Sequence, residues 1–235
     1  MLQQTQVARV LKKYGQFLAA FPTVLSLSRA TTAEVLGNWQ GLGYNRRALA
    51  LHRAARIIVS EHQGAIPRSP VVLQRLPGIG PASAAAVCVF AYDLPLPIIE
   101  TNIRSAVIHH FFREGVSVPD SDILPVVELT LDRDNPRDWY YALMDYGAWI
   151  KKTHANPSRR SRHHTVQSPF AGSRRQVRAT ILRALLAVSP SGMALEDIRT
   201  TALLAGRDSA EIQDVLEQLI REGFVVRSGQ LYRVA

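Results

Sequence analysis

Cysteine is nearly absent from this sequence: of 235 residues, one is cysteine, Cys88. A single thiol cannot close an intramolecular disulfide, build a zinc finger or supply the four thiolates of an iron–sulfur cluster. Cys88 lies in an apolar run at positions 84–90. Because free cysteine is among the most buried residue types, we expect Cys88 to be a core residue. Because one thiol cannot hold a cluster, we also expect no cofactor.

Long apolar runs and a leader sequence are also missing. Residues 1–6 have neither a basic start nor an apolar stretch, so the sequence predicts a cytoplasmic protein without a membrane partner. Acidic residues are few, 19 against 28 basic ones, which gives a net charge of +9. This charge favours a polyanionic partner, most simply nucleic acid. An acidic membrane surface is the alternative, but we find no basic amphipathic helix that would support it.

An alternating strand pattern is missing before residue 220, whereas apolar residues recur at helical spacing almost throughout. The sequence therefore predicts an all-α protein, long enough for one medium domain and a small appendage. Helices are expected at 6–20, from Thr32 onward, and at 46–62, 69–75, 81–92, 101–113, 121–131 and 138–152.

Residues 174–235 form a second, smaller unit in this prediction. Helices are expected at 174–188, 195–198 and 208–222, and residues 224–234 are expected to form a hairpin turning at Ser228 and Gly229. Three helices followed by a two-stranded ribbon are typical of a winged helix, which binds DNA or protein. The pattern does not distinguish between these partners.

Residues 151–178 hold eight Lys and Arg and no Asp or Glu. Asn, Pro, Ser and Gly interrupt helical spacing here, so we expect a basic linker over residues 151–173. A solvated tether and a contact with the DNA backbone would use the same side chains, and the two interpretations are compatible. The candidates for DNA contact are Lys151, Arg159, Arg160 and Arg162.

The most specific local pattern is Leu-Pro-Gly-Ile-Gly-Pro-Ala-Ser at residues 76–83, between two expected short helices. Glycines at 78 and 80 permit a tight turn and let the backbone approach a ligand closely. The N–H groups that begin the next helix can then meet a phosphate. An ordinary turn is the alternative. We favour a helix-hairpin-helix that grips a DNA backbone, through Pro77, Gly78, Ile79, Gly80, Ala82 and Ser83.

Three motifs together resemble one family. Residues 2–7 read Leu-Gln-Gln-Thr-Gln-Val, residues 39–44 read Trp-Gln-Gly-Leu-Gly-Tyr, and residues 76–80 read Leu-Pro-Gly-Ile-Gly. Their order and intervals are similar to those of the adenine DNA glycosylases of the MutY kind, within the endonuclease III superfamily. The resemblance covers roughly residues 1–150 and implies a two-lobed helix-hairpin-helix glycosylase domain that flips a base into a pocket between its lobes.

The resemblance assigns roles to single residues. Gln3 and Gln4 match the loop that wedges into DNA where the base leaves, and Tyr44 matches an aromatic that enters the stack beside the opposite base. We add the neighbouring Arg46 as a candidate for DNA binding.

Glu100 falls where the family has its catalytic aspartate, and Asn102 matches a residue that helps to orient catalytic groups. A carboxylate there is chemically sensible, because cleavage of an N-glycosidic bond builds positive charge on the sugar. The alternative for Glu100 is an acidic helix cap.

The sequence departs from the family at its acid and at its lysine. The family has a glutamate, two residues before the position of Met1, that protonates the leaving base. We therefore expect either that the protein extends further upstream or that it lacks the acid. Relatives that also cut the strand carry a lysine where Ala82 stands, so the resemblance implies a monofunctional enzyme.

The sequence also departs from the family at the cysteines that hold its iron–sulfur cluster and in its C-terminal domain. Lys151, Ser158, Ser161 and Gln167 stand near the spacing of the four cluster cysteines, and a winged helix stands where the family checks for oxidised guanine. Histidines at 109–110 and 163–164 lack further ligands at fixed spacing, so we expect no metal site.

The sequence thus predicts a monofunctional DNA glycosylase of base excision repair, a monomer that acts on double-stranded DNA of the nucleoid and, by resemblance, removes adenine. One alternative is a glycosylase for uracil, thymine or hypoxanthine, since the sequence does not reveal the base pocket. The other is a non-catalytic DNA-binding protein on the same scaffold, which the missing acid favours.

Overall fold

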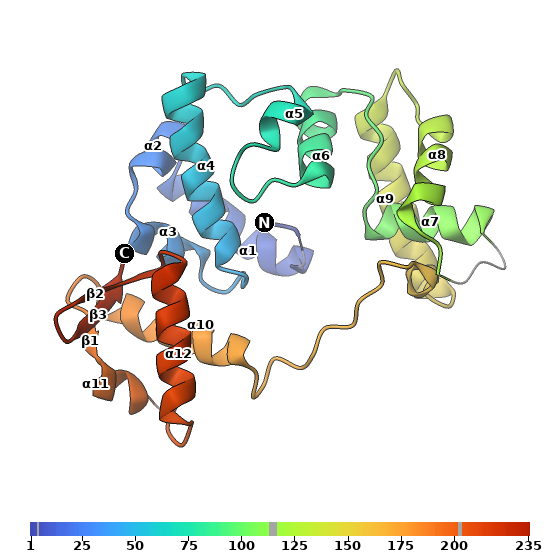
Figure 1. Ribbon diagram of the computed structural model, residues 1–235. Helices are drawn as coiled ribbons and strands as arrows, with labels where there is room; N and C mark the ends of the chain where they lie inside the picture. Colours follow the sequence, from blue (N-terminus) through green and yellow to red (C-terminus); the bar gives the residue numbers. More distant parts are fainter. Residues whose placement is uncertain (4, 113–116, 202–203) are drawn as a thin grey trace. The chain divides into compact units, whose positions relative to one another are not determined.

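The computed structural model describes residues 1–3, 5–112, 117–201 and 204–235 (Figure 1). These residues form two compact units, one of residues 1–66 together with 168–235, the other of residues 67–167. We call them unit 1 and unit 2. Across the described segments, no helix is long and apolar enough to cross a membrane.

Four helices form the N-terminal half of unit 1: α1 (Val7–Ala20), α2 (Val24–Arg29), α3 (Thr32–Trp39) and α4 (Arg46–His62). Helix α3 begins with a capping box, in which Thr31 Oγ1 accepts from the Glu34 N–H and the Glu34 carboxylate accepts from the Thr31 N–H. The expected helices are confirmed here. Helix α2 was not expected, because six residues are too few to show a helical period.

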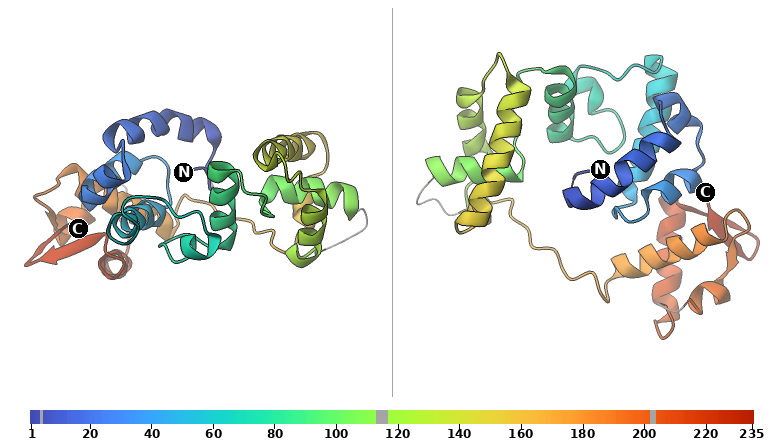
Figure 2. Two further views of the ribbon diagram at one scale, coloured as in Figure 1. Left: turned by 90° about the horizontal axis from the view of Figure 1, so that it is seen from above. Right: turned by 180° about the vertical axis from the view of Figure 1, so that it is seen from behind.

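The C-terminal half of unit 1 has the element order of a winged helix. Its elements are α10 (Arg174–Ala187), β1 (Met193–Ala194), α11 (Leu195–Arg199), α12 (Ser209–Arg221), β2 (Val225–Ser228) and β3 (Leu231–Val234). The expected hairpin of β2 and β3 is confirmed (Figure 2). Gly229 lies in its turn with φ +60°. The short strand β1 adds a third strand, pairing with β3 in an antiparallel sheet of order β1-β3-β2.

The two halves of unit 1 share one apolar core. Val35, Leu36 and Trp39 of α3 belong to the same buried cluster as Ile181 of α10 and Leu216 of α12. The compact units change at residues 66/67 and 167/168. The predicted domain boundaries at residues 150 and 173 stay predictions.

Charge supports the same association within unit 1. The Glu222 carboxylate, just after α12, forms ion pairs with Arg46 of α4 and Arg178 of α10. The backbone carbonyl of Glu222 accepts from Arg53 Nη2 at 3.0 Å. Arg178 also lies over the ring of Phe224, 4.9 Å from its centroid. The winged-helix half is therefore fixed to α4 by side chains that the sequence places far apart.

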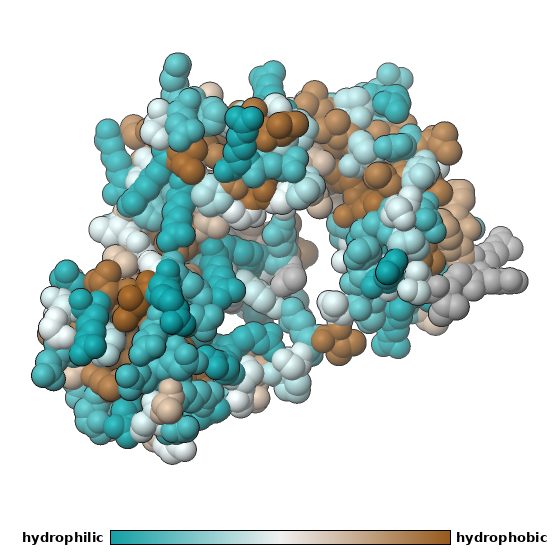
Figure 3. All heavy atoms as spheres, in the orientation of Figure 1, coloured by the Kyte–Doolittle hydropathy of each residue, from teal (hydrophilic) through white to brown (hydrophobic). Residues whose placement is uncertain are grey.

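Unit 2 is helical: α5 (Pro70–Leu73), α6 (Pro81–Tyr92), α7 (Thr101–Phe111), α8 (Asp120–Thr130), α9 (Pro136–Thr153) and the 3-10 turn η1 (Pro157–Arg160). Its core gathers Val89, Ile103, Ile108, Ile123 and Tyr140. On the face seen in Figure 3, apolar residues gather over α8 and its surroundings, where Leu129 is 87% exposed. Cys88 is fully buried in α6, as expected, and its thiol donates to the Arg68 carbonyl.

The basic tract is more ordered than the sequence led us to expect. Its first residues end α9 at Thr153, η1 follows at Pro157–Arg160, and α10 begins at Arg174. The first part of the predicted linker, residues 151–173, thus holds the end of α9 and the turn that Pro157 begins, and the linker as a boundary between domains stays a prediction. Residues 161–173 lie outside helices and strands.

Candidate active site and nucleic-acid interface

Glu100 occupies the N-cap of α7. Its Oε1 accepts hydrogen bonds from the N–H groups of Asn102 and Ile103, the second at 2.9 Å. The helix-cap alternative is therefore confirmed as a contact. It does not exclude chemistry at Glu100, because every hydrogen bond seen for this half-buried carboxylate uses the same oxygen. The cap instead fixes the carboxylate at the positive end of the helix dipole.

Asn102 lies on the first turn of α7, two residues after Glu100. Its Oδ1 is buried and has no hydrogen-bond partner within the described part of the protein. A buried acceptor without a donor costs about 1–3 kcal/mol. Such a cost is most simply offset when a ligand donates to the oxygen, so Asn102 is the strongest sign of a binding site that unit 2 provides.

Two residues of α9 hold the segment that carries Glu100. The Tyr140 hydroxyl, fully buried, accepts from the Ile98 N–H and donates to the Leu96 carbonyl, both at 3.1 Å. Burial raises the pKa of this hydroxyl. Further along α9, Gly147 lies so close to the start of α7 that a Cβ there would be 2.0 Å from the Asn102 carbonyl oxygen.

A bidentate ion pair connects α7 to α8. Arg104 Nε and Nη2 donate to the two carboxylate oxygens of Asp120, each at 2.8 Å. Hydrogen bonding to Arg104 lowers the pKa of the Asp120 carboxyl. Because Arg104 follows Asn102 by two residues, the pair fixes the first turns of α7 from the side of α8.

The hairpin motif lies between α5 and α6. Gly78 has φ +76°, a conformation that favours glycine, whereas Gly80 has φ −88° and open space where a Cβ would be. The fold itself therefore does not require glycine at 80, and an approaching ligand would benefit from it. Helix α6 begins without a side-chain cap, with Pro81 in its first turn.

The other motif residues surround this helix start. Gly78, Gly80 and Ala82 are exposed, whereas Pro77, Ile79 and Ser83 are half-buried. Ala82 offers a methyl group and no amine at the position where strand-cutting relatives have lysine.

The predicted wedge residues belong to unit 1, and Gln4 lies outside the described residues. Gln3 is exposed, and Tyr44 is exposed with a left-handed backbone, φ +49°. Both meet Arg47, a residue that the sequence prediction missed: its guanidinium donates to the Gln3 carbonyl and lies 5.4 Å from the Tyr44 ring centroid. The neighbouring candidate Arg46 is ion-paired with Glu222.

The basic candidates of unit 2 have different surroundings. Lys151 is half-buried at the end of α9, while Arg159 and Arg162 are exposed. Arg160 is used within the fold: it donates from Nη1 to the Phe112 carbonyl at 2.7 Å and from Nη2 to the Ile108 carbonyl at 3.1 Å, which caps the C-terminus of α7. Its predicted DNA contact stays a prediction.

The four positions near the family's cluster spacing do not suit iron and sulfur. They hold one amine, two hydroxyls and one amide, from Lys151, Ser158, Ser161 and Gln167, whereas such clusters are held mainly by cysteine thiolates. The hydroxyls are also engaged: Ser158 Oγ donates to Asn156 Oδ1 at 2.8 Å, and Ser161 Oγ accepts from the His163 N–H at 3.1 Å. The donor set does not fit the group.

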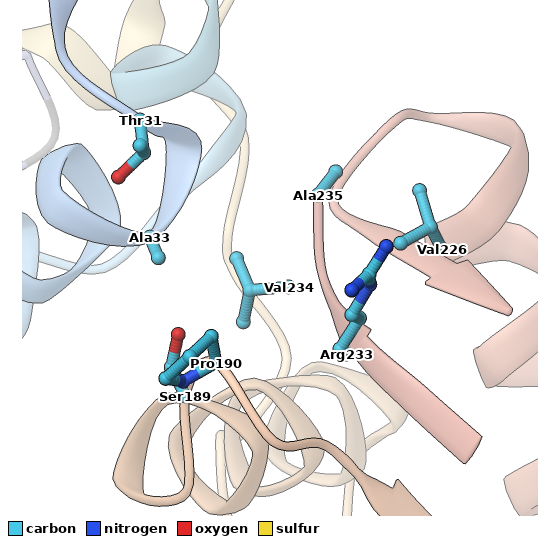
Figure 4. Close-up of a pocket in the computed structure, with 8 residues that line it drawn as sticks. All are labelled: Thr31, Ala33, Ser189, Pro190, Val226, Arg233, Val234 and Ala235. Carbon is cyan, nitrogen blue, oxygen red and sulfur yellow. The ribbon is translucent and has the colours of Figure 1, made fainter. Parts of the chain in front are cut away.

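The residues that the structure describes contain no group of three His, Cys, Asp or Glu that could hold a metal ion. A pocket of about 360 Å³ in unit 1 is lined by residues at the start of α3, the Ser189–Pro190 turn, β2 and β3 (Figure 4). None of its lining residues is a predicted site residue.

The structure therefore brings together some predicted residues and adds others. Glu100 meets Asn102 at one helix start, and Gln3 meets Tyr44 at Arg47. Tyr140, Gly147 and Arg47 were missed. The sequence offers a weak signal for Gly147 alone, because glycine inside a helix is unfavourable and calls for a packing reason.

Comparisons with known proteins identify the family of this chain. The model of the HhH-GPD superfamily base excision DNA repair proteins matches residues 1–122. The adenine DNA glycosylase of Mycobacterium tuberculosis H37Rv is 33% identical over 254 residues, covering 97% of this chain and 80% of that protein. That of Mycolicibacterium smegmatis is 33% identical, covering 96% and 81%.

Solved structures show the same fold. A thermostable thymine-DNA glycosylase superposes with a TM-score of 0.55 at 23% identity, covering 63% of this chain and 69% of that one. A non-covalent endonuclease III–DNA complex superposes with 0.51 at 16% identity, covering 72% and 73%. The motif resemblance and the expected glycosylase fold are confirmed, and the chain belongs to the HhH-GPD superfamily of base excision DNA repair proteins.

Proposed function

We propose that this chain is a monofunctional DNA glycosylase that hydrolyses the N-glycosidic bond of adenine in a mispaired DNA duplex. One observation carries the proposal: the Glu100 carboxylate and the unpartnered Asn102 oxygen lie at the same helix start. It is supported by 33% identity, over 97% of this chain, to an adenine DNA glycosylase.

Glu100 stabilises the charge that develops during cleavage. As the bond between C1′ and the base nitrogen breaks, the electron pair leaves with the base and the sugar becomes cationic. A carboxylate held by two backbone N–H groups remains oriented without reorganisation, which is the condition for electrostatic stabilisation of a transition state. The glutamate is one methylene longer than the family's aspartate, and the capping bonds to Oε1 compensate by fixing it.

Asn102 is suited to orient the attacking water. Its Oδ1 accepts a hydrogen bond from the water whose oxygen then bonds to C1′. That water gives up one proton, for which the Glu100 carboxylate is the nearby base, and the base gains one proton as it leaves, so the sum is the addition of one water. In the family the acid for that proton precedes the position of Met1, so a form extended upstream is part of the test. Because Ala82 provides no amine, the product is an abasic site in an uncut strand.

Binding to double-stranded DNA relies on backbone contacts. The glycines at 78 and 80 and the uncapped start of α6 suit a phosphate, and the exposed Arg159 and Arg162 add charge. We include in the proposal that the protein works as a monomer in the cytoplasm and without an iron–sulfur cluster, because the cluster positions hold no thiolate.

A single-turnover glycosylase assay tests the proposal. Labelled duplexes carry adenine opposite oxidised guanine, adenine opposite guanine, uracil, thymine opposite guanine, or hypoxanthine, and hot alkali reveals abasic sites. The chain, an upstream-extended form, and Glu100→Gln of each are compared. We expect release of adenine by the extended form and a loss of about 100-fold or more in Glu100→Gln.

Each other outcome has a definite meaning. Release of a different base would retain the enzyme and change its substrate. Salt-dependent DNA binding without cleavage in all four proteins would instead establish a non-catalytic DNA-binding protein. Glu100→Asp is the informative companion variant, since it shortens the side chain by the methylene that separates this sequence from its family.

A further inference from the structure

We infer that Arg47 is a positioning residue that holds the two predicted wedge segments together as one rigid element. The segments are the N-terminal loop, described at residues 1–3 and 5, and the turn at residues 40–44. The inference rests on the proposed function, because a wedge matters only to a protein that extrudes a base from DNA.

The guanidinium of Arg47 donates hydrogen bonds to oxygen atoms of the N-terminal loop. Nη1 donates to the Met1 carbonyl at 3.0 Å and also to the Gln3 carbonyl, and Nη2 donates to Thr5 Oγ1 at 2.9 Å. Planar guanidinium groups donate in fixed directions, so several acceptors around one group define its geometry closely. Three residues of the loop are thereby fixed by one side chain.

The same guanidinium supports the turn. Nη2 donates to the Gly43 carbonyl at 3.4 Å, and the guanidinium carbon lies 5.4 Å from the ring centroid of Tyr44 and 5.6 Å from that of Trp39. These distances lie within the range of cation–π attraction. Tyr44 has φ +49°, which is uncommon for a residue other than glycine, so its position needs such support.

Thr5 connects the two segments a second time. Its hydroxyl lies 3.3 Å from both the Leu42 carbonyl, to which it can donate, and the Gln3 carbonyl. Met1 is half-buried while Gln3 is exposed. The loop is therefore held on its buried side by Arg47, and Gln3 faces solvent. The exposed Tyr44 is held by the same arginine.

Position along α4 distinguishes Arg47 from its neighbour. Arg46 pairs with Glu222, whereas Arg47 faces the loop and the turn. Successive helical residues point about 100° apart, so two consecutive arginines serve two different surfaces of unit 1. A side chain that is inserted into DNA must be held rigidly, because a loop that changes conformation on contact with the duplex cannot displace a base.

Hydrogen exchange of the free protein tests the inference without DNA. Peptides that cover residues 1–9 and 38–46 are followed in wild type and in Arg47→Met, Arg47→Lys and Thr5→Val. The control is Arg56→Met, which removes an exposed arginine of the same helix whose Nε donates to the Ser28 carbonyl. We expect exchange in both peptides to rise about tenfold in Arg47→Met, less in Arg47→Lys and Thr5→Val, and not in the control.

A second measurement follows base extrusion by the fluorescence of 2-aminopurine placed at the target position of a duplex. Arg47→Met is expected to bind the duplex with similar affinity, to extrude the base poorly, and to lose about 100-fold in single-turnover rate. Arg47→Lys is expected to keep part of the base extrusion and part of the rate, because a lysine ammonium group reaches one carbonyl at a time.

The outcomes separate the inference from the proposed function. If Arg47→Met exchanges like wild type in both peptides, the inference is overturned, whatever the enzyme does. If exchange rises and extrusion falls while no duplex is cleaved by wild type, the glycosylase proposal fails and the support role of Arg47 stands. Should Arg47→Met not fold, Arg47→Lys and Thr5→Val decide in its place.

Discussion

Replacement of Gly147 by alanine is expected to disable the site without touching a reacting group. The new Cβ would lie 2.0 Å from the Asn102 carbonyl oxygen and 2.6 Å from its carbonyl carbon. Ordinary contact begins near 3.4 Å, so α9 and the start of α7 must separate by about 1.4 Å along this direction. The shift falls on the backbone that carries both Asn102 and the N–H groups that hold Glu100.

A displacement of about 1 Å costs a catalytic site roughly 100-fold in rate. We therefore expect Gly147→Ala to lower the single-turnover rate about 100-fold on whichever duplex the wild type cleaves, with duplex affinity changed by less than threefold, about 0.6 kcal/mol. Overpacking of this kind also lowers the free energy of unfolding, by about 1–3 kcal/mol. Urea unfolding under the assay conditions shows whether the variant is still folded.

Gly15→Ala is the matched control. Gly15 is an exposed glycine inside α1, and a Cβ there would meet nothing within 4 Å. That variant should keep its rate and gain up to about 1 kcal/mol of stability from the helix propensity of alanine. A folded Gly147→Ala variant that retains more than about a third of the wild-type rate would refute the claim that close packing of α9 sets the position of Glu100.

Two further predictions concern stability. Tyr140→Phe leaves the Ile98 N–H without its acceptor, so urea unfolding should show a loss of about 1–3 kcal/mol, and an unchanged midpoint would mean that this hydroxyl does not hold the segment. His52 is 1% exposed, and burial and Arg56 lower the pKa of its imidazole. The folded protein therefore favours neutral His52, whose stabilising contribution is complete above the unfolded pKa of about 6.5 and is lost as pH falls below it. In His52→Gln this part of the pH dependence should vanish, and a wild type whose unfolding free energy is the same at pH 5.5 and 7.5 would contradict the assignment.

Periodic features of the fold could be predicted from the sequence. Helix α4 lies at the expected residues 46–62 because its apolar residues recur at helical spacing, and α6 lies at the expected 81–92, where Pro81 begins a run of small residues. The hairpin at 224–234 was likewise visible from alternation and one glycine. Short elements such as α2 and β1 were missed, since two to six residues do not complete enough periods to be recognised.

The candidate site was predictable only where residues follow a motif. Glu100 and Asn102 could be named from their order along the chain, and their shared helix start is a local property. Arg47 could not be separated from Arg46 in this way, because the difference depends on what each faces after folding. Gly147 matters through a helix crossing with α7, which is a long-range packing property that no local pattern encodes.

The discontinuity of unit 1 has a consequence for the order of folding during synthesis. Residues 1–66 leave the ribosome long before residues 168–235, and all of unit 2 emerges between them. Until α10 and α12 arrive, Leu36 and Trp39 of α3 have no partners from the second half of their shared core. Unit 2, which is continuous, can complete its own core meanwhile. Residues 168–235 thus complete a unit whose other half is made before unit 2, and the Glu222 ion pairs with Arg46 and Arg178 form only after unit 2 has been synthesised.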